Sequence, residues 1–347
     1  MHANPILAEV TRGDTVESWH RGSFAVVDTE GRVVLSAGDV EAAVFPRSAI
    51  KPLQALALVE TGAADAFHLD DSELALACAS HNGEAVHVDA VEQWLARIGC
   101  TGGDLECGVQ LPGDTKALRE LLSAGGRERR AHNNCSGKHA GFLTVARHLG
   151  HPTQGYTRFT HPVQQRILGL LEQMTGLDDL AVQPRGIDGC GIPTIAVPLG
   201  NLALAMARFA DPGDQPEHRQ HACARIRHAM AARPYLVAGN ARFCTKIMEV
   251  TGERALVKTG AEGVYCAAFP HLGLGLALKI DDGATRAAEV ALGRLLRRLE
   301  ILGEDEARRL ADTLQPPVLN RAGERVGVVR PARDFPIQEV TGARGSV

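Results

Sequence analysis

The chain has 347 residues, of which 45% are hydrophobic and only 4% aromatic, and its formal net charge is −4 at pH 7. This length suffices for one large or two medium domains with a well-filled core. The acidic balance and the shortage of aromatic side chains argue against nucleic-acid binding, because such proteins usually carry a basic excess or a stacking surface.

Location and redox state follow from similar arguments. No run approaches the roughly 18 apolar residues of a membrane-spanning helix, and the first ten residues lack the pattern of a secretory leader. Eight cysteines are scattered without a repeating frame, as is common in a reducing compartment. We therefore expect a cytoplasmic protein with no membrane partner.

The first predicted elements are a hairpin and a helix. Apolar and polar residues alternate over 6–44 with a turn signal at 28–31, which indicates an antiparallel hairpin. Helix formers then fill 53–60 and stop at Gly62, so Ser48 and Lys51 fall near a helix N-terminus. Pro52 is compatible with a first turn, whose amides have no internal acceptor. Positions i and i+3 share a face there, which brings the lysine amine within reach of the serine oxygen.

This spacing points to nucleophilic catalysis. A serine hydroxyl needs a base, and lysine can be that base only as the free amine. Its ordinary pKa of about 10.4 must therefore be lowered by burial or by a second cation. We assign Ser48 as the candidate nucleophile and Lys51 as its base, although Ser-x-x-Lys alone also occurs on ordinary helices.

Two later motifs strengthen the assignment. Ser80 and Asn82 form a Ser-x-Asn element, and Lys258 begins a Lys-Thr-Gly element that precedes an apolar strand. The three motifs in this order resemble the signatures of serine β-lactamases and penicillin-binding proteins. The spacing departs from theirs, because Ser80 follows Ser48 closely and Lys258 lies far beyond. The resemblance therefore concerns the fold and the acyl-transfer machinery more than the substrate.

The middle of the chain is helical, and strands return near its end. Strands are expected at 263–281 and about 325–330, separated by a helix over 284–302 whose basic face we expect to be solvated or to form a subunit contact. Strands from both ends of the chain around a helical middle predict a mixed α/β (α+β) fold, with one antiparallel sheet packed by helices beside a mostly helical region. We expect a single catalytic unit over 1–347, with a sheet part at about 5–60 and 255–335 and a helical part at about 61–254. The helices expected in the middle are 85–97, 115–124, 138–149, 162–175, 197–210, 217–232 and about 241–251.

A possible metal site lies in the helical part. Cys135 and His139 are four residues apart on one helical face, and Cys190 lies in a glycine-bordered turn that could bring it near them. Sulfur and imidazole ligands of this kind favour zinc. One Cys-x-x-x-His without a second close pair is also often a coincidence.

Several segments taken together resemble one family, the class 3 L-asparaginases of the rhizobial type. The resemblance implies a serine β-lactamase-like fold, usually dimeric, that hydrolyses L-asparagine to aspartate and ammonia. It also implies two Ser-Lys pairs, Ser48 with Lys51 and Ser80 with Lys258. The segments that carry it are 45–52, 78–84, 132–139, 188–193 and 258–263.

The resemblance further implies a zinc site made by Cys135, Lys138 and Cys190. Lysine ligates only as the free amine, whereas His139 could ligate at neutral pH at no such cost. We follow the resemblance for Lys138 and expect His139 near the substrate. The site could be structural or could position the substrate.

The substrate carries an α-amino and an α-carboxylate group that must both be held. Asp188 suits the ammonium and Arg47 suits the carboxylate, although an exposed arginine on a helix face is common. We add Asn82 and His139 to the candidate substrate-binding residues.

We expect Ser48 to attack the side-chain amide with Lys51 as base, while Ser80 and Lys258 relay a proton to ammonia. Which serine attacks first stays open. Two alternatives are a glutaminase or other amidase on the same fold, and a non-catalytic zinc-binding or amino-acid-binding protein. A β-lactamase is less favoured, because it would need a secretory leader.

Overall fold

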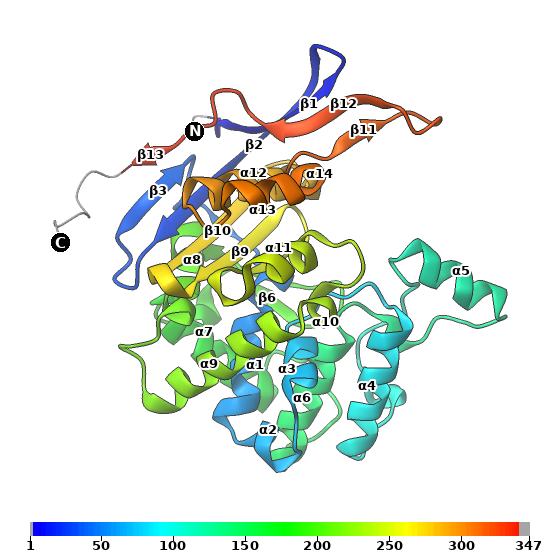
Figure 1. The fold of residues 1–347 in the computed structure, drawn as a ribbon. Coiled ribbons are helices and arrows are strands. Elements are labelled where there is room, and N and C mark those ends of the chain that lie inside the picture. Colours follow the sequence, from blue (N-terminus) through cyan, green and yellow to red (C-terminus); the bar gives the residue numbers. More distant parts are fainter. Residues whose placement is uncertain (1–2, 340–347) are drawn as a thin grey trace. The chain divides into compact units, whose positions relative to one another are not determined.

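The computed structural model describes residues 3–339, and the chain forms two compact units. One, here called the sheet unit, comprises Met1–Ala49, Ala196–Asp211 and Val257–Val347. The other, the helical unit, comprises Ile50–Ile195 and Pro212–Leu256. The ribbon in Figure 1 shows strands from both ends of the chain in the first unit and mostly helices in the second.

The sheet unit contains a nine-stranded antiparallel sheet with the order β11-β12-β1-β2-β10-β9-β8, and β3 pairs with both β2 and β13. The long strand β2 holds this sheet together, because its first half pairs with β1 and its second half pairs with β10 and β3. Every residue of β9 is buried, as expected for a strand covered on both faces. The strands are β1 (Ile6–Arg12), β2 (Thr15–Val27), β3 (Val33–Ala37), β8 (Leu256–Thr259), β9 (Val264–Phe269), β10 (Leu274–Ile280), β11 (Pro317–Leu319), β12 (Arg325–Pro331) and β13 (Gln338–Glu339), with a separate short pair of β4 (Ala43–Val44) and β7 (Val197–Pro198).

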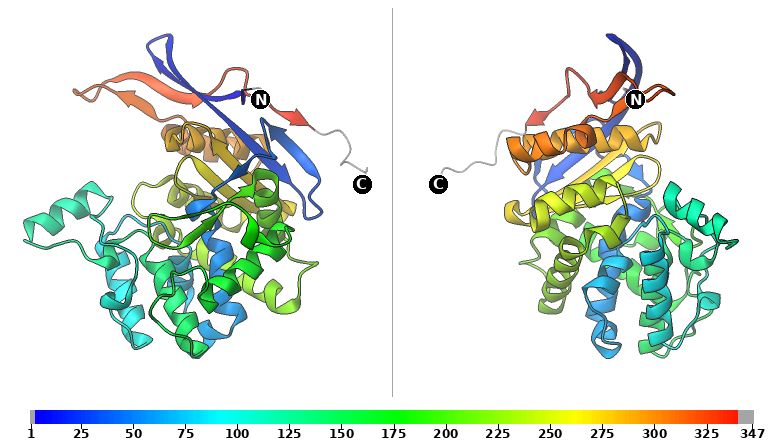
Figure 2. Two further views of the ribbon diagram at one scale, coloured as in Figure 1. Left: turned by 180° about the vertical axis from the view of Figure 1, so that it is seen from behind. Right: turned by 45° about the vertical axis from the view of Figure 1, so that its right-hand side comes forward.

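Helices pack on this sheet. Helix α8 (Leu199–Ala210) contacts β2, β9 and β10, and α12 (Thr285–Arg298) contacts β1, β9, β10 and β12. The backbone of α8 comes very close to β10, since a Cβ atom at Gly275 would lie 2.1 Å from the nitrogen of Ala207. Two short helices, α13 (Glu304–Arg309) and α14 (Ala311–Leu314), follow α12, and the views in Figure 2 show the orange α12–α13 segment lying along the strands.

The helical unit is built around α1, whose residues are buried from Lys51 to Val59 and which contacts α6, α7 and α9. A helix that is apolar on nearly all sides belongs in a core. A small hairpin of β5 (Arg185–Ile187) and β6 (Pro193–Ile195) lies in the same unit. The helices are α1 (Lys51–Glu60), α2 (Ala63–Ala66), α3 (Asp71–Ala77), α4 (Ala85–Arg97), α5 (Thr115–Ser123), α6 (Ser136–His148), α7 (Pro162–Thr175), α9 (Glu217–Ala232), α10 (Pro234–Ala238) and α11 (Phe243–Thr251).

Most predicted elements are confirmed, and so is the mixed α/β class. The expected hairpin over 6–44 has an additional turn at Gly13, whose φ of 54° suits glycine, so this range contains β1, β2 and β3, followed by the short β4. Ser48 lies in a 3₁₀ turn, Arg47–Ile50, just before α1 and not on its first turn. Within residues 3–339, no helix is long and apolar enough to cross a membrane.

Candidate active site

Lys51 is the first residue of α1 and is fully buried. Its Nζ atom donates hydrogen bonds to the carbonyl oxygen of Ala79, to Ser80 Oγ at 3.1 Å and to Cys135 Sγ at 3.1 Å. Ser80 follows the C-terminal end of α3, and Cys135 is the N-cap residue of α6. Three helices of one unit therefore place a lysine amine beside a serine and a cysteine.

Burial lowers the pKa of Lys51, and the positive charge of Lys138 acts in the same direction, while Cys135 opposes both. Taking an ammonium out of water penalises its charged form. The free amine of Lys51 is thus more accessible than that of a solvent-exposed lysine, as a general base requires.

A second lysine lies among two thiols. Lys138 Nζ donates to Cys190 Sγ at 3.0 Å, and a thiol hydrogen bond joins Cys190 to Cys135. That hydrogen bond and the two nearby lysines hold the pKa of Cys135 well below the ordinary thiol value, whereas the bond to Cys135 and burial raise the pKa of Cys190. These interactions favour the thiolate form at Cys135 over that at Cys190.

Cys135, Cys190 and Lys138 bring atoms together that could serve as metal donors. Within residues 3–339 no group of three or more His, Cys, Asp or Glu side chains could hold a metal ion, so a cluster of His139 with the two cysteines is not formed. The two sulfur atoms and the Lys138 amine do converge, through the contacts given above. The two sulfurs are donors that zinc accepts, whereas Lys138, whose pKa the neighbouring thiols raise, would have to lose a proton before its nitrogen could bind the metal.

His139 points its ring at a tyrosine. Its Nδ1 atom lies 2.8 Å from Tyr156 Oη, and that hydroxyl also accepts the backbone N–H of Glu106 at 2.7 Å. The hydroxyl can donate its own proton to Nδ1, which assigns the ring proton to Nε2. Within the described chain Nε2 is buried without a partner. Burial lowers the pKa of His139 well below its usual range, and Lys138 and Lys51 add to this, so the ring is neutral.

Asn82 is used within the helical unit. Arg242 donates to Asn82 Oδ1 at 2.9 Å and to the carbonyl of Ser80 at 3.3 Å, and Asn82 Nδ2 donates to the carbonyl of Asn240 at 3.1 Å. These bonds fix the backbone that carries Ser80. Sequence reasoning did not find Arg242 or Tyr156, because no spacing links residues so far apart along the chain.

Asp188 lies at the turn between β5 and β6. Its backbone N–H donates to the carbonyl of Ile192 at 2.8 Å, and its carboxylate accepts the N–H of Cys190 at 3.4 Å. Gly191 has a φ of 89°, which favours glycine and closes this turn. The hairpin thus fixes half-buried Asp188 two residues from Cys190.

Ser48 and Lys258 lie in the sheet unit. A Cβ atom at Gly260 would lie 2.7 Å from the carbonyl oxygen of Pro46 and 3.2 Å from the nitrogen of Ala49, so the Lys-Thr-Gly element runs against the turn that carries Ser48. Lys258 is buried on β8, and its amine donates to the carbonyl of Thr259 at 2.8 Å. Only a glycine at position 260 allows the backbone to come this close to the turn that carries Ser48.

Arg47 precedes Ser48 in that turn and has a φ of 52°. This left-handed conformation is uncommon for a residue with a side chain and often marks a functional segment.

Each unit therefore contains one serine and one lysine of the four candidates. The helical unit joins Lys51 to Ser80, a contact that the sequence did not predict. The pairs expected from the sequence, Ser48 with Lys51 and Ser80 with Lys258, each combine residues of both units and stay predictions.

Residues 8–331 match the family model described as L-asparaginase II. The chain belongs to the L-asparaginase II family. This is a family of amidohydrolases, in agreement with the resemblance drawn from the motifs. No curated protein matches the chain in a sequence search.

Solved structures show a more distant likeness. A crystal structure of Mglu in its tris and glutamate form is 19% identical over 81% of this chain, with a TM-score of 0.37, and the chain spans 59% of the length of that protein. A β-lactamase from Mycobacterium bovis is 15% identical over 80% of this chain and 94% of its own, with a TM-score of 0.38.

Proposed function

We propose that this L-asparaginase II family member hydrolyses the side-chain amide of L-asparagine to L-aspartate and ammonia through its serine and lysine residues. One observation supports this most directly. The buried amine of Lys51, with its lowered pKa, lies 3.1 Å from Ser80 Oγ. A lysine base beside a serine hydroxyl is the arrangement that activates a serine for acyl transfer.

The proposed steps combine this contact with the assignment of Ser48 as nucleophile, which comes from the sequence. Ser48 Oγ attacks the amide carbon while Lys51 accepts its proton. The C–N bond breaks, and ammonia leaves with a proton relayed by Ser80 and Lys258; the Lys51–Ser80 hydrogen bond provides the first link of that relay. Water then hydrolyses the serine ester, releasing aspartate and restoring the serine.

Substrate recognition must pair both α-groups of asparagine. We propose Asp188 for the ammonium, Arg47 for the carboxylate and the unpartnered Nε2–H of His139 for a substrate oxygen. Glutamine is longer by one methylene, a difference worth about 1–3 kcal/mol in a shaped pocket. A glutaminase or broader amidase is therefore the second candidate function.

We also propose that zinc binds here, with Cys135, Lys138 and Cys190 as its ligands. Bound there, zinc would supply a positive charge that fixes or polarises an oxygen ligand. The thiolate character of Cys135 and the convergence of both sulfurs with the Lys138 amine support this assignment.

The activity is tested by ammonia release from L-asparagine and L-glutamine, compared in parallel. We expect release from asparagine, and we expect Ser48→Ala to lower kcat by at least about 10³-fold. Ser80→Ala should also lower kcat. If an acyl-enzyme can be trapped in one of these two variants and not in the other, the serine missing from the variant without it is the nucleophile. Ser123→Ala, at an exposed position in α5, is the matched control. Release from neither amide by the wild-type protein would contradict the proposal, as would near-normal turnover by Ser48→Ala and Ser80→Ala.

The metal assignment has its own measurement. We expect elemental analysis of purified protein to find zinc. Cys135→Ala should lower the zinc-to-protein ratio by about tenfold or more, because the two remaining ligands hold zinc weakly. Cys100→Ala removes another buried thiol, outside this cluster, and should leave the ratio unchanged. An unchanged ratio in Cys135→Ala would remove the proposed site.

A further inference from the structure

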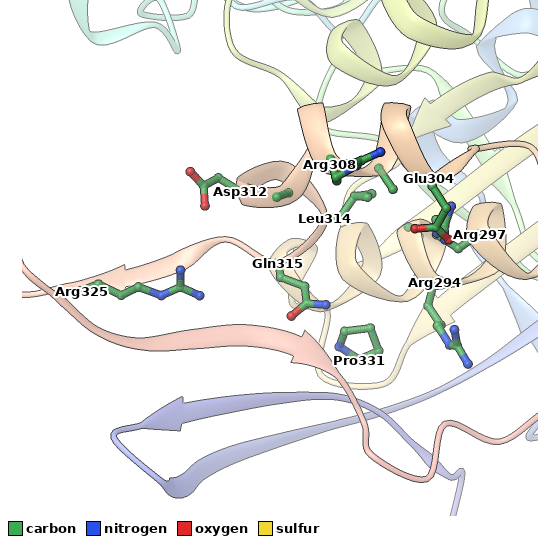
Figure 3. A pocket seen from close by; sticks show the side chains of 12 residues that line it. Arg294, Arg297, Glu304, Arg308, Asp312, Leu314, Gln315, Arg325 and Pro331 are labelled. Carbon is green, nitrogen blue, oxygen red and sulfur yellow. The ribbon is translucent and has the colours of Figure 1, made fainter.

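A cavity in the sheet unit has no part in the proposed reaction. It has a volume of about 450 Å³ and lies among α12, α13, α14 and the strand β12. Figure 3 shows its side chains, with Gln315 and Pro331 between Arg325 on one side and Arg294 on the other. Its volume falls within the range of small-molecule sites.

The cavity is rich in positive charge, although the chain as a whole is acidic. Four arginines line it, Arg294 and Arg297 from α12, Arg308 from α13 and Arg325 from β12. Only two carboxylates, those of Glu304 and Asp312, line the same cavity.

Two of these arginines are already paired, and two are not. Arg297 forms an ion pair with Glu304, and Arg308 forms one with Asp305. Arg294 and Arg325 have no side-chain hydrogen bond or ion pair to any residue within 3–339. Two guanidinium groups on different walls of the cavity are therefore available to a ligand.

The chemistry of the walls defines the ligand. A guanidinium group offers a planar fork of donors that matches carboxylate and phosphate oxygens in pairs. Because Arg294 and Arg325 come from a helix and a strand on different sides, one ligand that satisfies both needs two separated anionic groups. Leu314 and Pro331 add apolar wall for an organic body, and the amide of Gln315 can donate or accept.

We propose that this cavity is a second ligand site, separate from the serine and lysine residues, for a small organic polyanion with two or more phosphate or carboxylate groups. The inference does not depend on the proposed asparaginase activity. Phosphate-bearing and carboxylate-bearing metabolites share the recognition chemistry, so the experiment must distinguish them.

Binding is measured by titration calorimetry of the full chain with inorganic phosphate, pyrophosphate, ATP without magnesium, and citrate, each at the same ionic strength. We expect saturable binding of one molecule per chain for at least one polyanion and weaker binding of inorganic phosphate. Preference for pyrophosphate or ATP identifies a phosphorylated ligand, and preference for citrate identifies a polycarboxylate. Tighter binding of ATP than of pyrophosphate shows that the organic body contributes.

Matched variants locate the site. Arg294→Gln combined with Arg325→Gln should weaken binding by about tenfold or more. Arg309→Gln combined with Arg321→Gln removes the same charge from exposed positions outside the cavity and should leave the affinity within about twofold. Both arginines of the cavity pair are exposed, so unfolding midpoints should match those of the wild type. The proposal is overturned if no polyanion binds saturably, if the cavity variant binds as the wild type does, or if both double variants lose affinity equally.

Discussion

Two buried lysines in the helical unit respond to burial in opposite ways. The pKa of Lys51 is lowered, because desolvation dominates and Lys138 adds to it. Burial also disfavours the charged form of Lys138, but the thiol groups of Cys135 and Cys190 outweigh that effect and raise its pKa. Two lysines in contact with the same thiol cluster thus have pKa values shifted in opposite directions by their neighbours.

We expect the Tyr156 hydroxyl to stabilise the fold around His139 through its two hydrogen bonds. Tyr156→Phe would remove this partner from the N–H of half-buried Glu106 and from the Nδ1 atom of buried His139, at a cost of about 1–3 kcal/mol. Urea unfolding followed by circular dichroism measures the change. The free energy of unfolding should fall by that amount.

The control for this prediction is the same substitution at a more exposed tyrosine. Tyr235 donates to Glu84 and is 37% exposed, so water can replace its hydroxyl in Tyr235→Phe. We expect a loss below about 1 kcal/mol there. Equal losses in the two variants would show that the Tyr156 hydroxyl has no special role.

At the level of elements, α6 contacts α3, and Cys135 and Ser80 at the ends of these helices both contact the Lys51 amine. Gly137 makes this contact possible, because a Cβ atom there would lie 2.2 Å from the carbonyl oxygen of Leu76 on α3. No side chain fits without moving one helix against the other. The candidate site therefore depends on one glycine inside a helix, where glycine is otherwise unfavourable.

Two glycine substitutions test this packing. Gly137→Ala should lower the free energy of unfolding by about 1–3 kcal/mol, because the added methyl group forces the helices apart. Gly169→Ala, in α7, adds the same group where nothing lies within 4 Å, and should raise stability by about 0.5–1 kcal/mol. Thermal and urea unfolding of both variants give the two values. A stabilising effect of Gly137→Ala would refute the close contact.

On the scale of the whole molecule, the family resemblance predicts a homodimer. Val182 and Ile187 are 73% and 83% exposed, and apolar surface of this kind is common where chains associate. Light scattering across a dilution series should therefore give twice the mass of one chain over the micromolar range. A single-chain mass at every concentration would contradict the prediction.

The two units also divide the proposed machinery. Ser80 and Lys51 belong to the helical unit, while Ser48 and Lys258 belong to the sheet unit. Each Ser-Lys pair taken from the motifs names one residue from each unit, and both pairs stay predictions.

The sequence by itself determined the mixed α/β class, most of the helices and strands, and the family. These follow from local periodicity, from glycine and proline positions and from motifs, all of which are written in short segments. It also marked Ser48, Lys51, Ser80 and Lys258 as the candidate catalytic residues.

Only the tertiary structure decided which side chains meet. In it, Lys51 forms hydrogen bonds with Ser80 and Cys135. Asn82 likewise pairs with Arg242, and His139 with Tyr156. These partners are separated by 17 to 160 residues, and no local pattern encodes a contact across such a distance. Helix packing and burial decide it, and they also decide the pKa values on which the chemistry depends.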